Sequence, residues 1–449
     1  MKKALILGAG MVAKPMIDYL LDDGGIEVIM ASRTVSKAEK ILAKRKNGRA
    51  VPLLADDDKK LEDLISNVDI AVSLLPYTYH VKVAKLCLKH GIPLVTTSYV
   101  SPQMQELDKE AATKGILVLN EIGLDPGIDH MSAMRIIHEV RSRSGYIEEF
   151  RSYCGGLPAP EANDNPWGYK FSWSPRGVLM AGRNDAKYLK KSELIEIPGK
   201  ELFKNHWPIK IDKLDLETYP NRNSLPYKEL YGIDKAKTVY RGTLRYPGWC
   251  RTMLVVSELG LLTETEIHGV KNESYINILK KMLKIDQDAD PRKHIAGLYN
   301  IKPDDEIIDK LAWLDIFSDR KFKEESTTPL DFLSMLTLEK MKYQPGERDM
   351  IVLYHDFLAK FPDHLEKITS TLIDYGIPNG DSSMSRTVSL PAAIAVKLIL
   401  NGKITETGVR IPVKEEIYNP VLDELEKLDI VCQEQKQVLA PDAATVSPN

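Results

Sequence analysis

The chain has 449 residues and carries 61 Lys and Arg against 64 Asp and Glu, a formal net charge of −3. Hydrophobic residues make up 43% and charged residues 28%, which is typical of folded globular proteins and excludes global disorder. The length predicts about three domains. Because the charges are balanced and scattered, we expect neither a nucleic-acid partner nor a membrane partner.

The first 125 residues alternate between apolar β-type runs and helix-like segments. Expected strands are Lys3–Leu7, Glu27–Met30, Asp69–Leu74, Leu94–Thr97 and Leu117–Leu119. Expected helices are Val12–Asp22, Ser36–Ala43, Lys59–Ile65, Thr78–His90 and Pro102–Lys114. Strict alternation of strand and helix is typical of a doubly wound parallel sheet, the Rossmann-type α/β fold.

The rest of the chain predicts a second, α+β domain with a helical insertion. Expected strands are Phe150–Cys154, Thr238–Tyr246, Met350–Asp356 and Ile368–Leu372, with long loops at Gly155–Pro175 and Tyr219–Pro226. Expected helices are Glu273–Leu283, Asp305–Leu314, Leu330–Met341 and Leu390–Leu400, the last with Pro391 in its first turn.

These elements suggest a division of the chain. We expect a Rossmann domain over residues 1–125, an α+β substrate-binding and dimerisation domain over 126–260 and 342–389, and a helical insertion over 261–341. Residues 390–430 are expected to pack back onto the Rossmann domain.

Cysteine and histidine spacing argues against a disulfide framework and a metal site. Cys87, Cys154, Cys250 and Cys432 form no C-x-x-C pair, and the nine histidines form no H-x-x-x-H pair. The N-terminus passes directly into a short apolar run that glycine interrupts, so we expect no signal peptide and a cytoplasmic protein.

A glycine motif follows the first expected strand and opens the first helix. Gly8-Ala9-Gly10-Met11-Val12-Ala13 fits G-x-G-x-x-A in the strand–turn–helix context that binds a dinucleotide. The motif places Gly8, Gly10, Met11 and Val12 against the pyrophosphate, where a helix N-terminus favours negative charge. The alternative is an ordinary strand-to-helix turn that merely uses glycine.

The end of the second strand favours NADP(H) over NAD(H). Ser32-Arg33-Thr34 stands where an NAD enzyme places a carboxylate for the ribose 2′-hydroxyl. A guanidinium and two hydroxyls suit a 2′-phosphate instead. A solvated, functionless Arg33 is the alternative.

Two further strand ends carry candidate ligand contacts. Ser73-Leu74-Leu75-Pro76-Tyr77 and Thr96-Thr97-Ser98-Tyr99 each follow an expected strand. Ligands of such sheets bind beyond the carboxyl ends of the strands, although either segment could be a simple loop exit.

Six short sequence motifs together resemble those of one enzyme family. They are Thr97-Ser98-Tyr99, Leu124 to His130 (L-D-P-G-I-D-H), Tyr153 to Pro160 (Y-C-G-G-L-P-A-P), Tyr169 to Ser174 (Y-K-F-S-W-S), Tyr219 to Asn223 (Y-P-N-R-N) and Arg241 to Tyr246 (R-G-T-L-R-Y). The chain thereby resembles, over essentially its whole length, saccharopine reductase, the glutamate-forming saccharopine dehydrogenase family. In plants and animals a similar region follows a lysine-ketoglutarate reductase half; here we expect the stand-alone form.

The resemblance implies a reaction and a set of site residues. NADPH reduces the imine formed between glutamate and 2-aminoadipate 6-semialdehyde to saccharopine, reversibly, and the family suggests a homodimer. The implied substrate contacts are Ser98, Tyr99, Asp125, Arg222, Thr243, Leu244 and Arg245. The implied cofactor contacts, besides those above, are Asp56, Ser73, Leu75, Leu124 and Ser174.

The residue chemistry agrees with this reading in part. Saccharopine carries three carboxylates, and the planar guanidinium groups of Arg222 and Arg245 suit carboxylate recognition. Asp125, Tyr99 and Cys154 are the candidates for the proton shuttle that imine formation needs, and no single base is favoured. Asp125 could equally cap the following helix, and Cys154 could be a small hydrophobic residue.

Two other functions stay open. A related imine reductase such as carboxynorspermidine synthase would share the N-terminal Rossmann segment but lack the Y-C-G-G-L-P-A-P and G-T-L-R motifs. A catalytically silent NADP-binding regulator would keep the glycine loop and lose the substrate arginines.

Overall fold

The computed structural model describes residues 1–22 and 25–439. By their contacts these residues divide into two compact units. Unit 1 takes Met1–Ile147 and Ala359–Val438, and unit 2 takes Glu148–Leu358 together with Leu439.

Unit 1 is built on a seven-stranded parallel sheet in the order β17-β6-β5-β4-β1-β2-β3. Its strands are β1 (Lys3–Leu7), β2 (Glu27–Ser32), β3 (Gly48–Pro52), β4 (Ile70–Ser73), β5 (Leu94–Thr96), β6 (Leu117–Leu119) and β17 (Gly408–Arg410). The order runs outward in both directions from β1, so the predicted doubly wound α/β fold is confirmed.

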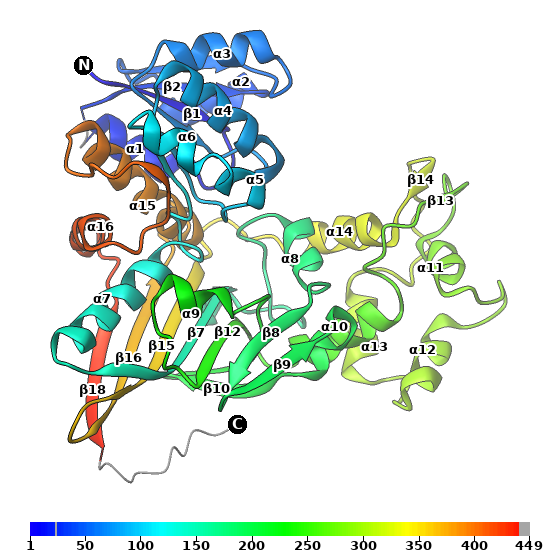
Figure 1. The fold of residues 1–449 in the computed structure, drawn as a ribbon. Helices are drawn as coiled ribbons and strands as arrows, with labels where there is room; N and C mark the ends of the chain where they lie inside the picture. Colours follow the sequence, from blue (N-terminus) through cyan, green and yellow to red (C-terminus); the bar gives the residue numbers. More distant parts are fainter. Residues whose placement is uncertain (23–24, 440–449) are drawn as a thin grey trace. The chain divides into compact units, whose positions relative to one another are not determined.

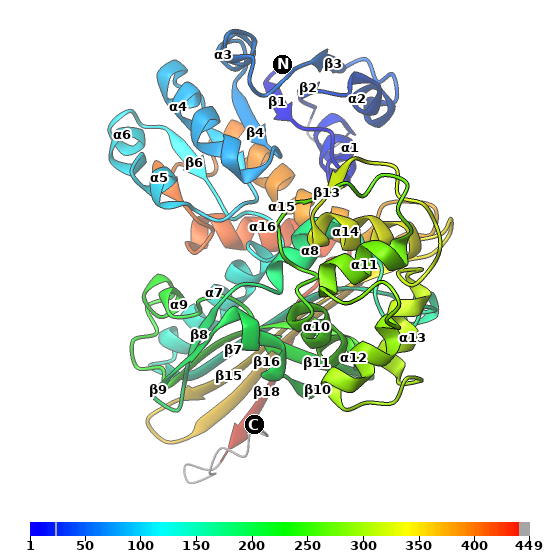
Figure 2. The same cartoon turned by 90° about the vertical axis from the view of Figure 1, so that its right-hand side faces the viewer.

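Helices cover both faces of this sheet (Figures 1 and 2). The helical segments of unit 1 are α1 (Lys14–Asp22), α2 (Val35–Leu42), α3 (Asp58–Ser66), η1 (Tyr77–Tyr79), α4 (His80–His90), α5 (Pro102–Gln105), α6 (Asp108–Thr113), α7 (Ile128–Ser142), α15 (Ser383–Leu400) and α16 (Glu415–Lys427). The unit also contains the neighbouring strands β16 (Leu365–Tyr375) and β18 (Gln433–Leu439).

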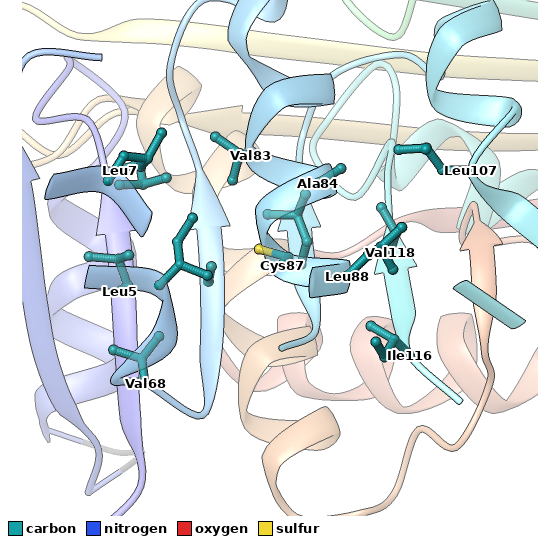
Figure 3. Close-up of a cluster of buried hydrophobic side chains, with 14 of the residues drawn as sticks. Leu5, Leu7, Val68, Val83, Ala84, Cys87, Leu88, Leu107, Ile116 and Val118 are labelled. Carbon is teal, nitrogen blue, oxygen red and sulfur yellow. The ribbon is translucent and has the colours of Figure 1, made fainter. Parts of the chain in front are cut away.

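The core on one face of the sheet follows from the period of two along each strand. Leu5 and Leu7 of β1 point to the same face and pack in one buried cluster with side chains of α4 (Figure 3). Those of α4 are spaced for one side of a helix and include Val83, Cys87 and Leu88. This packing fixes the carboxyl ends of the strands, where the candidate cofactor residues lie.

Helix α15 begins earlier than predicted, and the expected place of Pro391 in its first turn is wrong. The N-cap is Ser382, whose hydroxyl accepts from the Ser385 amide, and Pro391 lies inside the helix. The polar residues that precede Pro391 resemble a loop in sequence. In the helix their hydroxyls bond back one turn, as the Thr387 hydroxyl does to the Ser383 carbonyl at 2.8 Å.

Helix α15 is also long and apolar enough to cross a membrane by length and composition alone. In the structure 72% of its residues are buried, and it packs against α1 and α16 of the same unit. Most of its apolar surface is therefore covered by protein.

Unit 2 contains a mixed sheet in which β10, β11, β12, β7 and β15 are successive neighbours, and β8 joins β9 to β12. Its strands are β7 (Tyr146–Pro158), β8 (Ala186–Lys190), β9 (Glu193–Ile197), β10 (Trp207–Ile211), β11 (Leu214–Pro220), β12 (Thr238–Arg245) and β15 (Asp349–Lys360), and β13 (Ile267–His268) pairs with β14 (Ser326–Thr327). Strand β12 is antiparallel to β11 and parallel to β7.

The helices of unit 2 include the group α11 to α14, which Figure 2 shows gathered together. The helical segments are η2 (Pro160–Ala162), α8 (Pro175–Ala181), η3 (Gly199–Lys204), α9 (Pro226–Leu230), α10 (Trp249–Glu258), α11 (Tyr275–Leu283), α12 (Pro291–Tyr299), α13 (Glu306–Trp313) and α14 (Pro329–Lys340).

The structure differs from the sequence prediction in the middle of the chain. The first expected loop is partly strand, because β7 continues to Pro158, and Tyr219 and Pro220 end β11 instead of opening a loop. By their contacts, residues 126–147 and 359–389 lie in unit 1.

Candidate active site

The glycine loop joins β1 to α1 in unit 1. Gly8 has φ +113°, and its amide donates to the Ala31 carbonyl at 2.8 Å. A Cβ at Gly8 would lie 3.0 Å from the Leu74 carbonyl oxygen, so the turn requires glycine. A Cβ at Gly10 would meet nothing within 4 Å, which leaves room for a ligand to approach the backbone.

The remaining loop residues differ in exposure. Met11 is exposed and Ala13 is fully buried, as the tight packing position of the motif requires. Helix α1 begins at Lys14, two residues later than predicted, so Val12 belongs to the turn before the helix.

The end of β2 presents the residues predicted to choose the cofactor. Ser32 is the last residue of β2, and its hydroxyl accepts from the Thr34 amide at 3.2 Å. Arg33 is exposed and forms no ion pair with any residue the structure describes. A free guanidinium at this strand end fits a 2′-phosphate.

Three further cofactor candidates lie in unit 1. Asp56 is exposed, and its carboxylate accepts from the Tyr79 hydroxyl at 3.4 Å. Ser73, the last residue of β4, is fully buried, and Leu75 follows it half-buried.

The buried Ser73 hydroxyl contacts a residue that the sequence analysis did not select. Ser73 Oγ lies 2.8 Å from Nδ1 of His80, whose Nε2 lies 2.8 Å from Oγ of Ser98. His80 is the first residue of α4 and is only 4% exposed. A single histidine at a helix start has no distinguishing sequence pattern, so only the fold reveals this contact.

Two proton-shuttle candidates meet in unit 1. Tyr99 follows β5 and is 40% exposed, and its hydroxyl donates to Oδ1 of Asp125 at 3.1 Å. Asp125 stands in a tight loop after β6 that Gly127 makes possible, because a Cβ there would lie 2.0 Å from the Gly123 carbonyl oxygen. The neighbouring Leu124 is buried.

A buried pair ties these two loops together. The Glu121 carboxylate accepts from the Val100 amide at 2.8 Å and lies 2.8 Å from Nε2 of the fully buried His130. The Glu121 amide also donates to the Ser98 carbonyl at 3.1 Å. The segments that carry Ser98, Tyr99 and Asp125 are therefore held in fixed relation.

In unit 2, β12 presents Thr243 and Arg245 on one face of the sheet. Cys154 of β7 is the ladder partner of Thr243, so its side chain points to the same face. Leu244 points to the opposite face and is fully buried, so only its backbone is available to a ligand on the Arg245 side.

Arg245 is the most unusual charge of unit 2. It is 5% exposed, its guanidinium carbon lies 4.9 Å from the centre of the Tyr169 ring and 5.4 Å from that of Trp249, and Nη1 donates to the Leu244 carbonyl at 2.7 Å. Within the described parts of the chain its Nε has no hydrogen-bond partner and the group forms no ion pair.

Ion pairs of Lys170 hold the segment that carries Tyr169, one of the aromatic residues in contact with Arg245. Lys170 is buried and lies 2.7 Å from the Glu347 carboxylate and 2.8 Å from that of Asp164. These contacts anchor the segment that carries Tyr169. A third aromatic residue, Tyr219, is buried beside Thr243 and Arg245, and burial raises the pKa of its phenol to about 12.

Arg222 lies elsewhere in unit 2. It follows the end of β11 with φ +53°, its carbonyl accepts from the Lys187 amide at 2.9 Å, and its side chain is exposed. The Asn221 amide donates to the Arg241 carbonyl just after the end of β11. This bond places Asn221 beside Arg241, several residues along β12 from Arg245. Arg222 and Arg245 are therefore not neighbours on the sheet.

Ser174, the remaining cofactor candidate, is the N-cap of α8. Its hydroxyl accepts from the Gly177 amide at 3.2 Å, and the residue is exposed. The structure therefore gives Ser174 a helix-capping role of its own.

Comparisons with known proteins bear on both units. The family model described as the saccharopine dehydrogenase NADP binding domain matches residues 4–119, and the model of the saccharopine dehydrogenase C-terminal domain matches residues 123–430. The chain belongs to the saccharopine dehydrogenase family. The predicted family resemblance is confirmed.

Two fungal relatives in this family match along nearly their whole length. Saccharopine dehydrogenase [NADP(+), L-glutamate-forming] of Schizosaccharomyces pombe is 40% identical over 97% of this chain and 99% of its own. The enzyme of that name from Saccharomyces cerevisiae is 42% identical over 94% and 96%. The chain also matches the mitochondrial alpha-aminoadipic semialdehyde synthase of Bos taurus at 37% identity, spanning 48% of that longer protein.

A solved structure in the family has the same fold. Apo saccharopine dehydrogenase (L-Glu forming) from Saccharomyces cerevisiae superposes with a TM-score of 0.88 at 39% identity, covering 97% of this chain and all of that one. The NADP-binding assignment of the N-terminal region is thereby supported at family level.

Proposed function

We propose that this chain interconverts L-saccharopine with L-glutamate and 2-aminoadipate 6-semialdehyde, using NADP(H). In the oxidative direction saccharopine, NADP⁺ and water give glutamate, the semialdehyde, NADPH and a proton. The C–N bond of the secondary amine is oxidised to an imine, which water then cleaves. The full-length match to glutamate-forming relatives supports this assignment.

The observation that carries the proposal is the buried guanidinium of Arg245. A buried charge without an opposite charge is costly, so such a site is stabilised when a ligand anion arrives. Tyr169 and Trp249 hold the guanidinium plane by cation–π contact and leave Nε without a partner. We assign Arg245 to one carboxylate of saccharopine.

Arg222 is assigned to a different carboxylate. Its separation from Arg245 along the sheet suits a long substrate with three carboxylates better than a two-arginine clamp on one. Thr243 and the Leu244 backbone lie between the two arginines and complete the substrate contacts on this sheet.

The glycine loop and the β2 end would hold the cofactor. Gly8, Gly10, Met11 and Val12 would receive the pyrophosphate, and Ser32, Arg33 and Thr34 the 2′-phosphate. Asp56, Ser73, Leu75, Leu124 and Ser174 are assigned to the same ligand. NADP(H), when bound, accepts or supplies the hydride at the carbon of the C–N bond.

Asp125 and Tyr99 are assigned to the proton transfers. Imine formation and hydrolysis each move a proton near neutral pH. The Tyr99 hydroxyl donates to Asp125, so the carboxylate is oriented and can receive a proton from the amine or from water. Cys154 shares a sheet face with Thr243 and stays the third candidate.

The roles of the three chain regions, the assembly state and the location in the cell are proposed as well. We assign cofactor binding to residues 1–125, substrate binding and dimerisation to 126–260 and 342–389, and a supporting role to the insertion 261–341. We expect a cytoplasmic homodimer, which cell fractionation and light scattering would test.

The reductive reaction with alternative amines tests the proposed function. Purified protein is mixed with NADPH, the semialdehyde and either glutamate or 1,3-diaminopropane, and the products are identified by mass spectrometry. Saccharopine formed with glutamate alone supports the proposal. Turnover with the diamine but not with glutamate would identify the related imine reductase, and no turnover with either would favour a silent regulator.

A further inference from the structure

His80 bridges the carboxyl ends of two neighbouring strands in unit 1. Ser73 ends β4 and is the ladder partner of Thr96, which ends β5. The His80 ring lies across these two ends, with Nδ1 2.8 Å from Ser73 Oγ and Nε2 2.8 Å from Ser98 Oγ. Thr96 Oγ1 is a more distant neighbour, 3.3 Å from Nε2. One ring therefore contacts a serine assigned to the cofactor and a serine assigned to the substrate.

The donor and acceptor roles of the two ring nitrogens depend on each other. Burial lowers the pKa of His80 to about 4, so the imidazole is neutral near pH 7. A neutral imidazole has one donor and one acceptor nitrogen. If Nδ1 donates to Ser73, then Nε2 accepts from Ser98, and the other tautomer reverses both bonds.

The tautomer decides what Ser98 can offer to a ligand. When the Ser98 proton is used toward Nε2, its oxygen is left to accept from an ammonium or amine group. When Nε2 donates to Ser98, the hydroxyl proton is free to reach a carboxylate. A change in the bonding of Ser73 therefore changes the bonding that is available at Ser98.

We propose that His80 is a positioning residue that couples the cofactor-side Ser73 to the substrate-side Ser98 through its two ring nitrogens. The proposal rests on the proposed function, which assigns Ser73 and Ser98 to their two ligands. His80 is itself buried, and it acts through these two serines.

Two amide variants separate the two contacts. In His80→Asn the side-chain amide places a polar atom near the position of Nδ1, and in His80→Gln it places one near Nε2. His80→Asn should keep the affinity for NADP⁺ within about twofold and raise the KM for saccharopine about tenfold, the loss of one hydrogen bond. His80→Gln should keep the saccharopine KM and weaken NADP⁺ about tenfold.

The proposal is overturned if the two variants respond alike in saccharopine KM and NADP⁺ affinity. If both variants change the two parameters equally, or change neither, His80 is only a packing residue. Thermal unfolding of each variant is recorded as a control. A folding defect would lower the fraction of active protein, but it would not change the saccharopine KM and the NADP⁺ affinity independently of each other.

A double variant supplies a second, independent readout. If His80 acts on substrate through Ser98, then Ser98→Ala combined with His80→Asn should have the same saccharopine KM as Ser98→Ala alone. Additive effects of the two changes would overturn the coupling even if the single variants fold poorly.

Failure of the proposed function is distinguishable from failure of this inference. Absence of saccharopine turnover in the unaltered protein would refute the proposed function. NADP⁺ titration followed by fluorescence tests the Ser73 contact of His80 separately from turnover. Weaker binding in His80→Gln than in His80→Asn supports that contact, and equal binding overturns the coupling.

Discussion

Glu217 and Arg245 are directly opposite each other in the antiparallel ladder of β11 and β12, yet they do not form an ion pair. The Glu217 carboxylate accepts instead from the amides of Gly248 at 3.0 Å and Cys250 at 2.6 Å, at the start of α10. An anion at a helix N-terminus is stabilised by free amides and by the helix dipole. The carboxylate opposite Arg245 in the ladder is thus occupied by these amides, and Arg245 keeps its charge available.

Replacing Glu217 tests this relationship. Glu217→Gln keeps one acceptor for the α10 amides and should lower the free energy of unfolding by about 1–2 kcal/mol, without weakening saccharopine binding. Urea unfolding at pH 7 measures the effect. If the carboxylate did neutralise Arg245, the variant would leave a buried charge uncompensated, and the loss would reach about 3–5 kcal/mol with altered substrate affinity.

Loss of the Arg245 charge should impair substrate binding selectively. Arg245→Met keeps a long side chain against Tyr169 and Trp249 but removes the charge-assisted bonds, each worth about 1.5–3 kcal/mol. The saccharopine KM should rise about 10- to 100-fold, while NADP⁺ affinity stays unchanged. Arg251→Met, an exposed residue of α10 that pairs with Asp305, is the matched control and should leave both constants intact. Unaltered kinetics in Arg245→Met would exclude the carboxylate role.

Arg33 should discriminate between the two dinucleotides. Removing its guanidinium in Arg33→Ala deletes the bonds to the 2′-phosphate, so NADPH should bind at least about tenfold more weakly while NADH is unaffected. Isothermal titration with each dinucleotide measures this difference. Arg49→Ala changes an exposed arginine of the adjacent strand β3 and serves as control. Equal weakening of NADPH and NADH would contradict the 2′-phosphate assignment.

The Tyr99–Asp125 pair should control the chemical steps more than binding. Asp125→Asn should reduce kcat about 100-fold or more, because an amide cannot shuttle a proton. Tyr99→Phe removes only the orienting bond and should lower kcat about tenfold. Steady-state kinetics of both variants measure this. An unreduced kcat in Asp125→Asn would move the shuttle elsewhere, to Cys154 first.

The buried His80 should make the protein acid-sensitive. Its folded pKa of about 4 lies below the unfolded value of about 6.5, so the unfolded chain binds more protons as the pH falls through this window. Stability contributed by the neutral ring is complete above the unfolded pKa and declines below it, by about 2 kcal/mol between pH 7 and pH 5. His80→Gln should lack that decline in urea unfolding. Equal declines in both proteins would show that the ring is not buried in its neutral form.

The sequence predicted the fold of unit 1 well because strand and helix alternate with clear periodicity there. It missed β3 and β17 as members of the sheet, since β3 begins with glycine and ends with proline and β17 contains a single apolar side chain, Val409. It misplaced the start of α15 because serine and threonine hydroxyls that bond within a helix look like loop residues in sequence.

The candidate site was only partly predictable for a similar reason. Glycine spacing and strand ends are local signals, so Gly8, Gly10 and the residues after β2 could be selected. His80, Glu217 and Trp249 have no local pattern, and their roles arise from contacts that the folded sheets create. Arg222 and Arg245 look equivalent in sequence, and only the strand register separates them.

The most direct test of the account is the initial rate of absorbance increase at 340 nm when the protein is given NADP⁺ and increasing saccharopine, with glutamate assayed in the same samples. We expect a saturable rate and one glutamate formed for each NADPH. No saccharopine-dependent increase between pH 7 and pH 10, or NADPH formed without glutamate, would contradict it.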